Sequence, residues 1–102
     1  MSDGLTNLER NKLNAVFSRY PNIEKAILYG SRAKGTHKPF SDVDITLIGN
    51  AFSHNEMGKL SMDIDDLLLP YQVDMSIFHT LANPDLIEHI KRIGITIYTK
   101  PN

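Results

Sequence analysis

The stretch 27–48, ILYGSRAKGTHKPFSDVDITLI, constrains the fold more than any other part of the chain. It begins with a short apolar run that Gly30 closes, and it ends with a segment, 42–47, in which polar and apolar residues alternate. Alternation with a period of two predicts a strand with two different faces, and it puts Asp42 and Asp44 on the same face. If the two apolar segments are neighbouring strands, the Gly-Ser turn and both carboxylates meet in space.

Helical and strand patterns alternate along the rest of the chain. Two Ser/Thr-x-x-Glu capping boxes start helical runs, at Thr6 and at Ser53, and Pro70 terminates the second run. A third helix starts at Asn83 with a proline at its first position, and Gly94 follows its end. The patterns predict helices over 6–19, 53–69 and 84–93, a short helical turn over 31–34, a loop over 35–41, and strands over 26–29, 43–47, 72–78 and 95–99.

This order of elements predicts an α/β (α+β) fold with a mixed sheet of about four strands and helices packed mainly on one face. The first two strands are expected to be antiparallel, since only a turn and loop join them. The second and third are separated by a long helix, which predicts a right-handed crossover between parallel or nearly adjacent strands. At 102 residues, the whole chain, 1–102, is expected to form a single domain.

Composition excludes several functional classes. Eleven Lys and Arg against twelve Asp and Glu give a net charge of −1, so stable binding of nucleic acid is not expected. The absence of cysteine excludes disulfides, thiolate catalysis and cysteine-based zinc sites. The N-terminus is polar, and no apolar run approaches the ~20 residues that span a membrane. A cytoplasmic protein is therefore expected.

Three aspartates carry the predicted chemistry. Asp74 lies on the polar face of the strand over 72–78, which the crossover would place beside the strand that carries Asp42 and Asp44. Carboxylate oxygens suit Mg²⁺, and two such ions can hold the attacking and leaving oxygens of a displacement at phosphorus. Taken alone, however, Asp-x-Asp is a common sequence and is more typical of solvated charges at the start of a strand.

The turn at Gly30 and Ser31 predicts a phosphate site. Glycine lets the backbone turn tightly, and Ser31 opens a helical turn whose N–H groups and hydroxyl can bond phosphate oxygens. Arg32 and Lys34 add positive charge and are predicted phosphate contacts. The alternative is an ordinary strand-to-helix turn with solvated basic residues.

Other short motifs are less informative. Gly30 and Gly35 have the glycine spacing of a P-loop, but Thr36 and His37 stand where that motif needs Lys and Ser or Thr. The Gly-x-Gly-x-x-Gly dinucleotide pattern is absent from the chain. The four histidines have no paired metal spacing and are interpreted as surface or packing residues, with His37 the one nearest the turn.

The joint pattern resembles a known superfamily. Gly30-Ser31, ten intervening residues, Asp42-Val43-Asp44 on a strand, and a later Asp74 are similar to the signature of the DNA polymerase beta-like nucleotidyltransferases. The short length, the GSRAKG turn, the SDVD strand start and the closing Gly-Ile-Thr-Ile-Tyr strand resemble the minimal nucleotidyltransferases in particular. The resemblance extends over nearly the whole chain.

The resemblance implies a reaction and a role for each matched residue. The reaction is transfer of a nucleoside monophosphate, AMP from ATP, to a hydroxyl group, with pyrophosphate leaving. Gly30 and Ser31 match the triphosphate-binding turn of the family, Asp42 and Asp44 match its metal-binding pair, and Asp74 matches the third carboxylate that helps to activate the acceptor hydroxyl. All three aspartates are thus expected catalytic and metal-binding residues.

The resemblance also implies a partner. Minimal nucleotidyltransferases are paired with small helical HEPN proteins, in some cases as the antitoxin that adenylylates the toxin, and a homo-oligomer is the other expectation. The alternative function is an inactive nucleotide-binding module that neutralises a partner by covering it, for which Phe40, Phe52 or the leucines of 67–69 could supply apolar surface. A nucleotidyltransferase that acts alone on nucleic acid or an aminoglycoside is a weaker third hypothesis.

Overall fold

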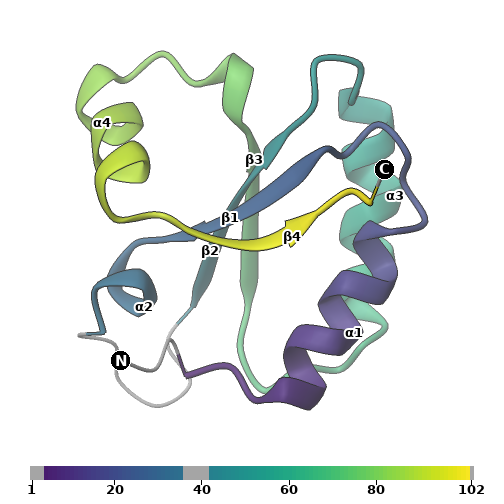
Figure 1. Cartoon of the computed structure of the whole chain (residues 1–102). Helices are drawn as coiled ribbons and strands as arrows, with labels where there is room; N and C mark the ends of the chain where they lie inside the picture. The colour runs from purple at the N-terminus through teal and green to yellow at the C-terminus, as the bar shows by residue number, and fades with distance from the viewer. Residues whose placement is uncertain (1–3, 36–41, 102) are drawn as a thin grey trace.

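The structure, a computed structural model, describes residues 4–35 and 42–101. These residues form a mixed four-stranded sheet with helices against it (Figure 1). In chain order the elements are α1 (Asn7–Phe17), β1 (Lys25–Tyr29), α2 (Ser31–Lys34), β2 (Val43–Ile48), α3 (His54–Asp65), β3 (Val73–Ile77), a 3₁₀ turn η1 (Phe78–Thr80), α4 (Pro84–Ile93) and β4 (Ile95–Thr99). Every predicted helix and strand is present, whereas η1 was not predicted. Residues 36–41 of the predicted loop, with His37 and Phe40, lie outside the described residues.

The strand order is β3-β2-β1-β4. β1 is antiparallel to both β2 and β4, and β2 is parallel to β3. The predicted antiparallel first pair and the parallel pair joined through α3 are therefore confirmed. Because β1 runs towards the start of β2, the turn after β1 and the first residues of β2 and β3 lie at the same end of the sheet.

The two long helices bury one face of the sheet. Figure 1 shows α1 and α3 together on the same side of the strands. The buried side chains on that side come from both helices and from alternate strand positions, which confirms the prediction of helices mainly on one face. The fully buried members are Leu13, Val16 and Phe17 of α1, Leu60 of α3, Ala26 and Leu28 of β1, and Val43, Ile45 and Leu47 of β2.

Both predicted capping boxes are present. The Thr6 hydroxyl accepts from the Glu9 backbone N–H at 3.1 Å, and the Glu9 carboxylate accepts from the Thr6 N–H at 3.0 Å. Ser53 and Glu56 make the same reciprocal pair at the start of α3. These bonds satisfy amide groups that have no partner within the helix, so they fix where each helix begins.

The second helix is shorter than predicted. The apolar pattern predicts helix up to Pro70, but α3 ends at Asp65, and the three leucines of 67–69 follow outside the helix. The physical reason is the length of the crossover: twelve helical residues span about 18 Å, which already returns the chain along a five- or six-residue strand. Leu68 takes a left-handed conformation with φ of 54° and is 87% exposed.

α4 lies apart from the two long helices. A side chain added at Gly94, just after α4, would come within 2.6 Å of Cγ2 of Ile27, a residue that alternates with the core-facing Ala26 and Leu28 of β1. α4 therefore packs on the β1 side chains that point away from the main core, and Figure 1 shows it across the strands from α1 and α3.

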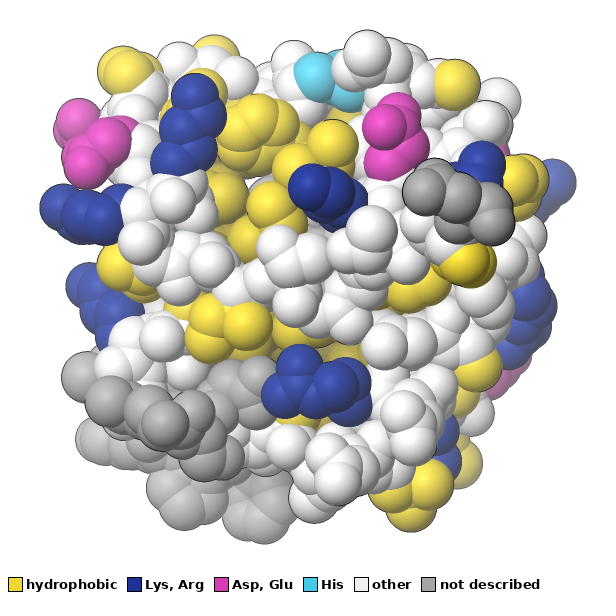
Figure 2. Space-filling view, in the orientation of Figure 1, with side chains coloured by type: hydrophobic (Ala, Val, Ile, Leu, Met, Phe, Trp, Pro, Cys, Tyr) yellow, Lys and Arg dark blue, Asp and Glu magenta, His cyan; other side chains and the backbone are white. Residues whose placement is uncertain are grey.

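The surface agrees with the balanced composition. On the face drawn in Figure 2, Lys and Arg side chains are dispersed among apolar and uncharged groups. None of the helices within 4–35 and 42–101 combines the length and the apolar character needed to cross a membrane. Phe52, one of the apolar residues considered as a contact surface, is only 2% exposed and belongs to the core.

Candidate active site

The parallel pairing of β2 and β3 brings two of the predicted carboxylates together. Asp44 and Asp74 are direct register partners on these neighbouring strands. Asp42 immediately precedes β2 and is exposed, as is Asp74, while Asp44 is half-buried. The pKa of Asp44 is raised, first by burial and then by the negative charges of Asp74 and Asp42. The negative charges of Asp74 and Asp42 therefore both act on Asp44 at this end of the sheet.

The donor set fits a hard divalent cation. Mg²⁺ in proteins commonly uses one or two carboxylates, and substrate phosphates and water complete its coordination. Asp44 and Asp74 provide such a pair, and their mutual repulsion is the condition that a bound cation would relieve. Within the described residues, no three His, Cys, Asp or Glu side chains are gathered into a group that could hold a metal ion. A site that uses all three aspartates remains a prediction.

The predicted phosphate turn lies directly against Asp44, one member of this pair. Gly30 has a φ of 79°, a conformation that side chains rarely adopt, and an added Cβ would lie 2.5 Å from Oδ2 of Asp44. Both the backbone conformation and the space therefore require glycine here. The Gly30 carbonyl accepts from the Lys34 N–H at 3.2 Å, which closes the single turn of α2. Ser31 opens that turn and is exposed.

The two predicted basic contacts are placed differently from one another. Lys34 is exposed at the end of α2. Arg32 is only 3% exposed, and its guanidinium carbon lies 4.7 Å from the centre of the Tyr71 ring. This cation–π contact ties α2 to the segment that leads into β3. The phosphate role of both residues remains a prediction, and for Arg32 the packing indicates a structural contribution as well.

Tyr29 borders Asp44, and His89 contacts Tyr29 and Gly30; neither was predicted as a site residue. Tyr29 is the register partner of Asp44, and its pKa is raised, first by burial and also by Asp44 and Asp74, while a hydrogen bond with Ser76 opposes the rise. His89 of α4 packs edge-on against the Tyr29 ring, with 6.4 Å between ring centres. Tyr29 ends a short apolar run in which polar and apolar residues do not alternate, so the sequence did not mark it as a site residue. For His89, nearly sixty residues further along, the sequence carries no signal either.

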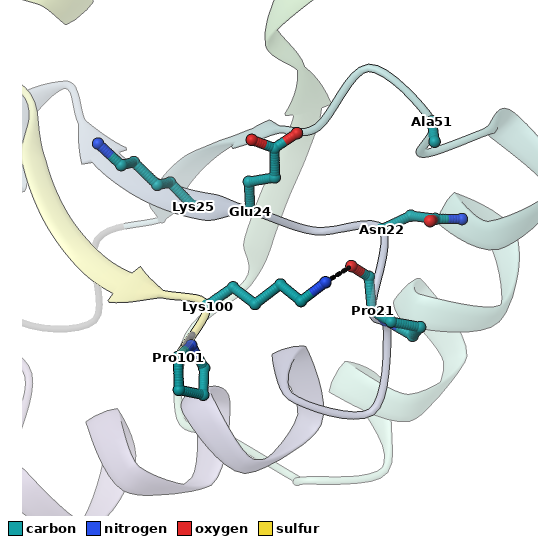
Figure 3. A pocket seen from close by; sticks show the side chains of 7 residues that line it. All are labelled: Pro21, Asn22, Glu24, Lys25, Ala51, Lys100 and Pro101. Carbon is teal, nitrogen blue, oxygen red and sulfur yellow. Dashed lines mark hydrogen bonds between the residues drawn. The ribbon is translucent and has the colours of Figure 1, made fainter.

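A separate cavity lies at the opposite end of the strands. It has a volume of about 630 Å³ and is lined by Pro21, Asn22, Glu24, Lys25, Ala51, Lys100 and Pro101 (Figure 3). The Lys100 ammonium donates to the Pro21 carbonyl at 2.9 Å across it. None of the predicted site residues lines this cavity, so its size does not make it the candidate active site.

Comparison with protein families gives one match that covers most of the chain. Residues 11–102 match the family described as "Polymerase beta, Nucleotidyltransferase". A comparison with curated protein sequences found no match. The matched range contains the Gly-Ser turn and all three aspartates, so the family match covers the part of the chain that carries the candidate site.

Solved structures share the fold at low sequence identity. A toxin–antitoxin complex with AMP-PNP aligns with a TM-score of 0.72 and 20% identity, covering 89% of this chain and 73% of the matched one. The MntA–HepT toxin–antitoxin aligns with a TM-score of 0.67 and 18% identity, covering 93% and 74%. A tri-AMPylated Shewanella oneidensis HEPN toxin in complex with MNT antitoxin gives 0.68 and 17%, covering 94% and 74%. At these identities the likeness establishes the fold.

Proposed function

The chain belongs to the polymerase beta nucleotidyltransferase family, and from this membership we propose that it transfers AMP from ATP to an acceptor hydroxyl, releasing pyrophosphate. The observation that carries the proposal is the register of Asp44 with Asp74 directly beside Gly30. A glycine turn beside two carboxylates on neighbouring strands offers the parts that phosphoryl transfer uses, because its catalysis is mostly positioning and charge stabilisation.

Each residue has a role in the proposed reaction. Gly30 allows the backbone to approach the triphosphate, and Ser31 offers its hydroxyl and N–H to phosphate oxygens. Asp42 and Asp44, with Asp74, would hold Mg²⁺, which when bound supplies positive charge against the phosphate oxygens. The acceptor oxygen attacks the α-phosphorus as the bond to the β-phosphate oxygen breaks, and Asp74 takes the acceptor proton. Pyrophosphate leaves with the electron pair of the broken bond.

The acceptor is proposed to be a hydroxyl on a small helical HEPN-type protein. Two of the matched structures support this proposal, because one contains AMP-PNP and another is described as a tri-AMPylated HEPN toxin with its MNT antitoxin. The chain would then act as an antitoxin in the cytoplasm, a setting that its lack of cysteine supports. The alternative to a HEPN-type partner is a second copy of this chain, which would complete the active site in a homo-oligomer.

The proposal is tested by following the α-phosphate. The purified chain is incubated with Mg²⁺, ATP labelled at the α-phosphate, and a candidate HEPN-type partner protein. We expect label on the partner and release of unlabelled pyrophosphate, and we expect the Asp42→Asn, Asp44→Asn double variant to lose both. Equal labelling by wild type and double variant would refute the assignment of these carboxylates. Absence of labelling, with ATP still bound, would refute the transferase.

The second candidate function is a nucleotide-binding module that neutralises its partner by contact alone. Exposed apolar side chains favour it, since Leu68 is 87% exposed, Met62 69% and Leu8 65%. Exposed apolar side chains mark a contact surface where they form a contiguous patch. Neutralisation of the partner by the Asp42→Asn, Asp44→Asn variant distinguishes the two functions. The variant neutralises the partner fully if contact is sufficient, and it fails to do so if AMP transfer is required.

A further inference from the structure

A histidine of helix α4 forms a hydrogen bond with the Gly-Ser turn at Gly30 and Ser31, here called the nucleotide turn. The Gly30 backbone N–H donates a hydrogen bond to Nε2 of His89 at 3.3 Å, across 59 positions of sequence. In this bond Nε2 is the acceptor, so His89 serves the turn as a hydrogen-bond acceptor. The same ring packs edge-on against Tyr29, the residue before the turn, with an interplanar angle of 83°. His89 thus contacts two consecutive residues at the end of β1.

Gly30 needs such a partner more than most residues do. Glycine has the largest backbone freedom of any residue, and Gly30 sits at φ of 79° just after the last paired residue of β1. A buried or half-buried backbone N–H also requires a hydrogen-bond acceptor. The bond to His89 fixes the peptide plane between Tyr29 and Gly30, and this plane sets the direction in which Ser31 starts α2.

The helix that carries His89 is itself firmly placed. The Asn83 side chain caps α4 by accepting from the backbone N–H groups of Asp85 and Leu86, at 2.9 and 3.3 Å. At the other end, Ile90 is 2% exposed, and Gly94 packs so closely on Ile27 that an added Cβ would overlap it. A side chain on a capped, close-packed helix can position a loop more sharply than one on another loop.

We propose that His89 is a positioning residue of the nucleotide turn, which it keeps in the conformation that receives the triphosphate. This inference rests on the proposed function, because it assigns His89 to the same site. His89 does not contact the reacting atoms in this role. Its loss should therefore weaken binding of the nucleoside triphosphate while leaving the chemical step close to its original rate.

Three substitutions at this position separate the hydrogen bond from ring packing. His89→Phe keeps an aromatic ring against Tyr29 but removes the acceptor, His89→Gln keeps an acceptor at similar reach, and His89→Asn is too short to reach. Loss of one hydrogen bond predicts a rise of about 2- to 12-fold in the KM for ATP and in the Kd of Mg²⁺-ATP for Phe and Asn. The kcat should stay within about 2-fold, and Gln should restore wild-type values.

The control is His54→Phe, at the exposed first residue of α3, which should leave both constants unchanged. If His89→Phe does not fold, the comparison of Gln with Asn decides the question. Equal KM and Kd for Gln, Asn and wild type would overturn the proposal, as would a loss confined to kcat.

A second readout is independent of activity. In the nucleotide-free protein, the amide proton and nitrogen chemical shifts of Gly30 should move in His89→Phe and His89→Asn, and return in His89→Gln. Unchanged Gly30 shifts in all three variants would overturn the proposed contact. If wild type binds no ATP and yet the Gly30 shifts respond as expected, the proposed function fails and the positioning of the turn by His89 stands.

Discussion

Neutralising Asp44 should make the free protein more stable while it removes the proposed transferase activity. The carboxylate faces Asp74 across two neighbouring strands, and burial together with Asp74 and Asp42 raises its pKa above the ordinary value of 3.8. A carboxyl with a raised folded-state pKa costs stability when it is charged. This cost is absent below the ordinary pKa, grows as pH rises from the ordinary pKa to the folded-state pKa, and is complete above the folded-state pKa.

The geometry sets the size of the effect. Like charges directly opposite each other on neighbouring strands destabilise a sheet by roughly 0.2–1 kcal/mol, and the half-exposed setting of Asp44 keeps the repulsion in this range. For a domain of about 100 residues, each kcal/mol shifts Tm by about 4–8 °C. Asp44→Asn should therefore raise Tm by roughly 1–8 °C at pH 7, whereas most substitutions lower it.

The assay is unfolding by urea and by heat, at pH 7 and at stepwise lower pH, without metal or nucleotide. The stability difference between Asp44→Asn and wild type should shrink as pH falls towards 3.8. Asp74→Asn should also stabilise the protein. The Asp44→Asn, Asp74→Asn double variant should gain less unfolding free energy than the two single variants together, because both changes relieve the same repulsion. Adding Mg²⁺-ATP should stabilise wild type more than Asp44→Asn.

The matched control is Asp65→Asn, at the exposed end of α3, which should change stability by less than about 0.5 kcal/mol. The reasoning is refuted if Asp44→Asn is no more stable than wild type at pH 7. It is equally refuted if the Asp44 and Asp74 effects simply add, since they would then be independent of each other.

Three further predictions concern single positions, each measured by urea unfolding. Gly30→Ala should cost about 1–3 kcal/mol and abolish ATP binding, because its Cβ would overlap the Asp44 carboxylate; a stable variant that binds ATP would contradict this. Tyr20→Phe removes a 2.5 Å hydrogen bond to Asp63 and should cost about 0.5–1.5 kcal/mol at pH 7. Burial and Asp63 raise the pKa of Tyr20 to about 12, so wild type should lose stability between pH 10 and 12. The difference in unfolding free energy between wild type and Tyr20→Phe should therefore become smaller over this range. A difference that stays constant would contradict the raised pKa. Leu68→Gly should raise the free energy of unfolding by about 0.5–1 kcal/mol, because it removes a leucine from a left-handed conformation. A lower free energy of unfolding would show instead that the Leu68 side chain makes stabilising contacts.

The sequence predicted most of the fold because its strongest signals are local. Alternation with a period of two depends only on the pleat of a strand, so it placed Asp44 and Asp74 on polar faces without knowledge of their neighbours. Capping boxes fixed the starts of α1 and α3 for the same reason, since each involves only four residues. The length of the connection between β2 and β3 then predicted their parallel pairing.

Tertiary structure alone decided the features that depend on distance across the fold. The end of α3 at Asp65 follows from how far the crossover must reach, which overrides an apolar pattern that continues through 67–69. The stacking of Arg32 on Tyr71 and the bond from Gly30 to His89 join segments about forty and sixty positions apart. The sequence determined which residues could form the site, and packing decided which of them meet, because long-range contacts depend on the arrangement of whole elements and leave no local pattern.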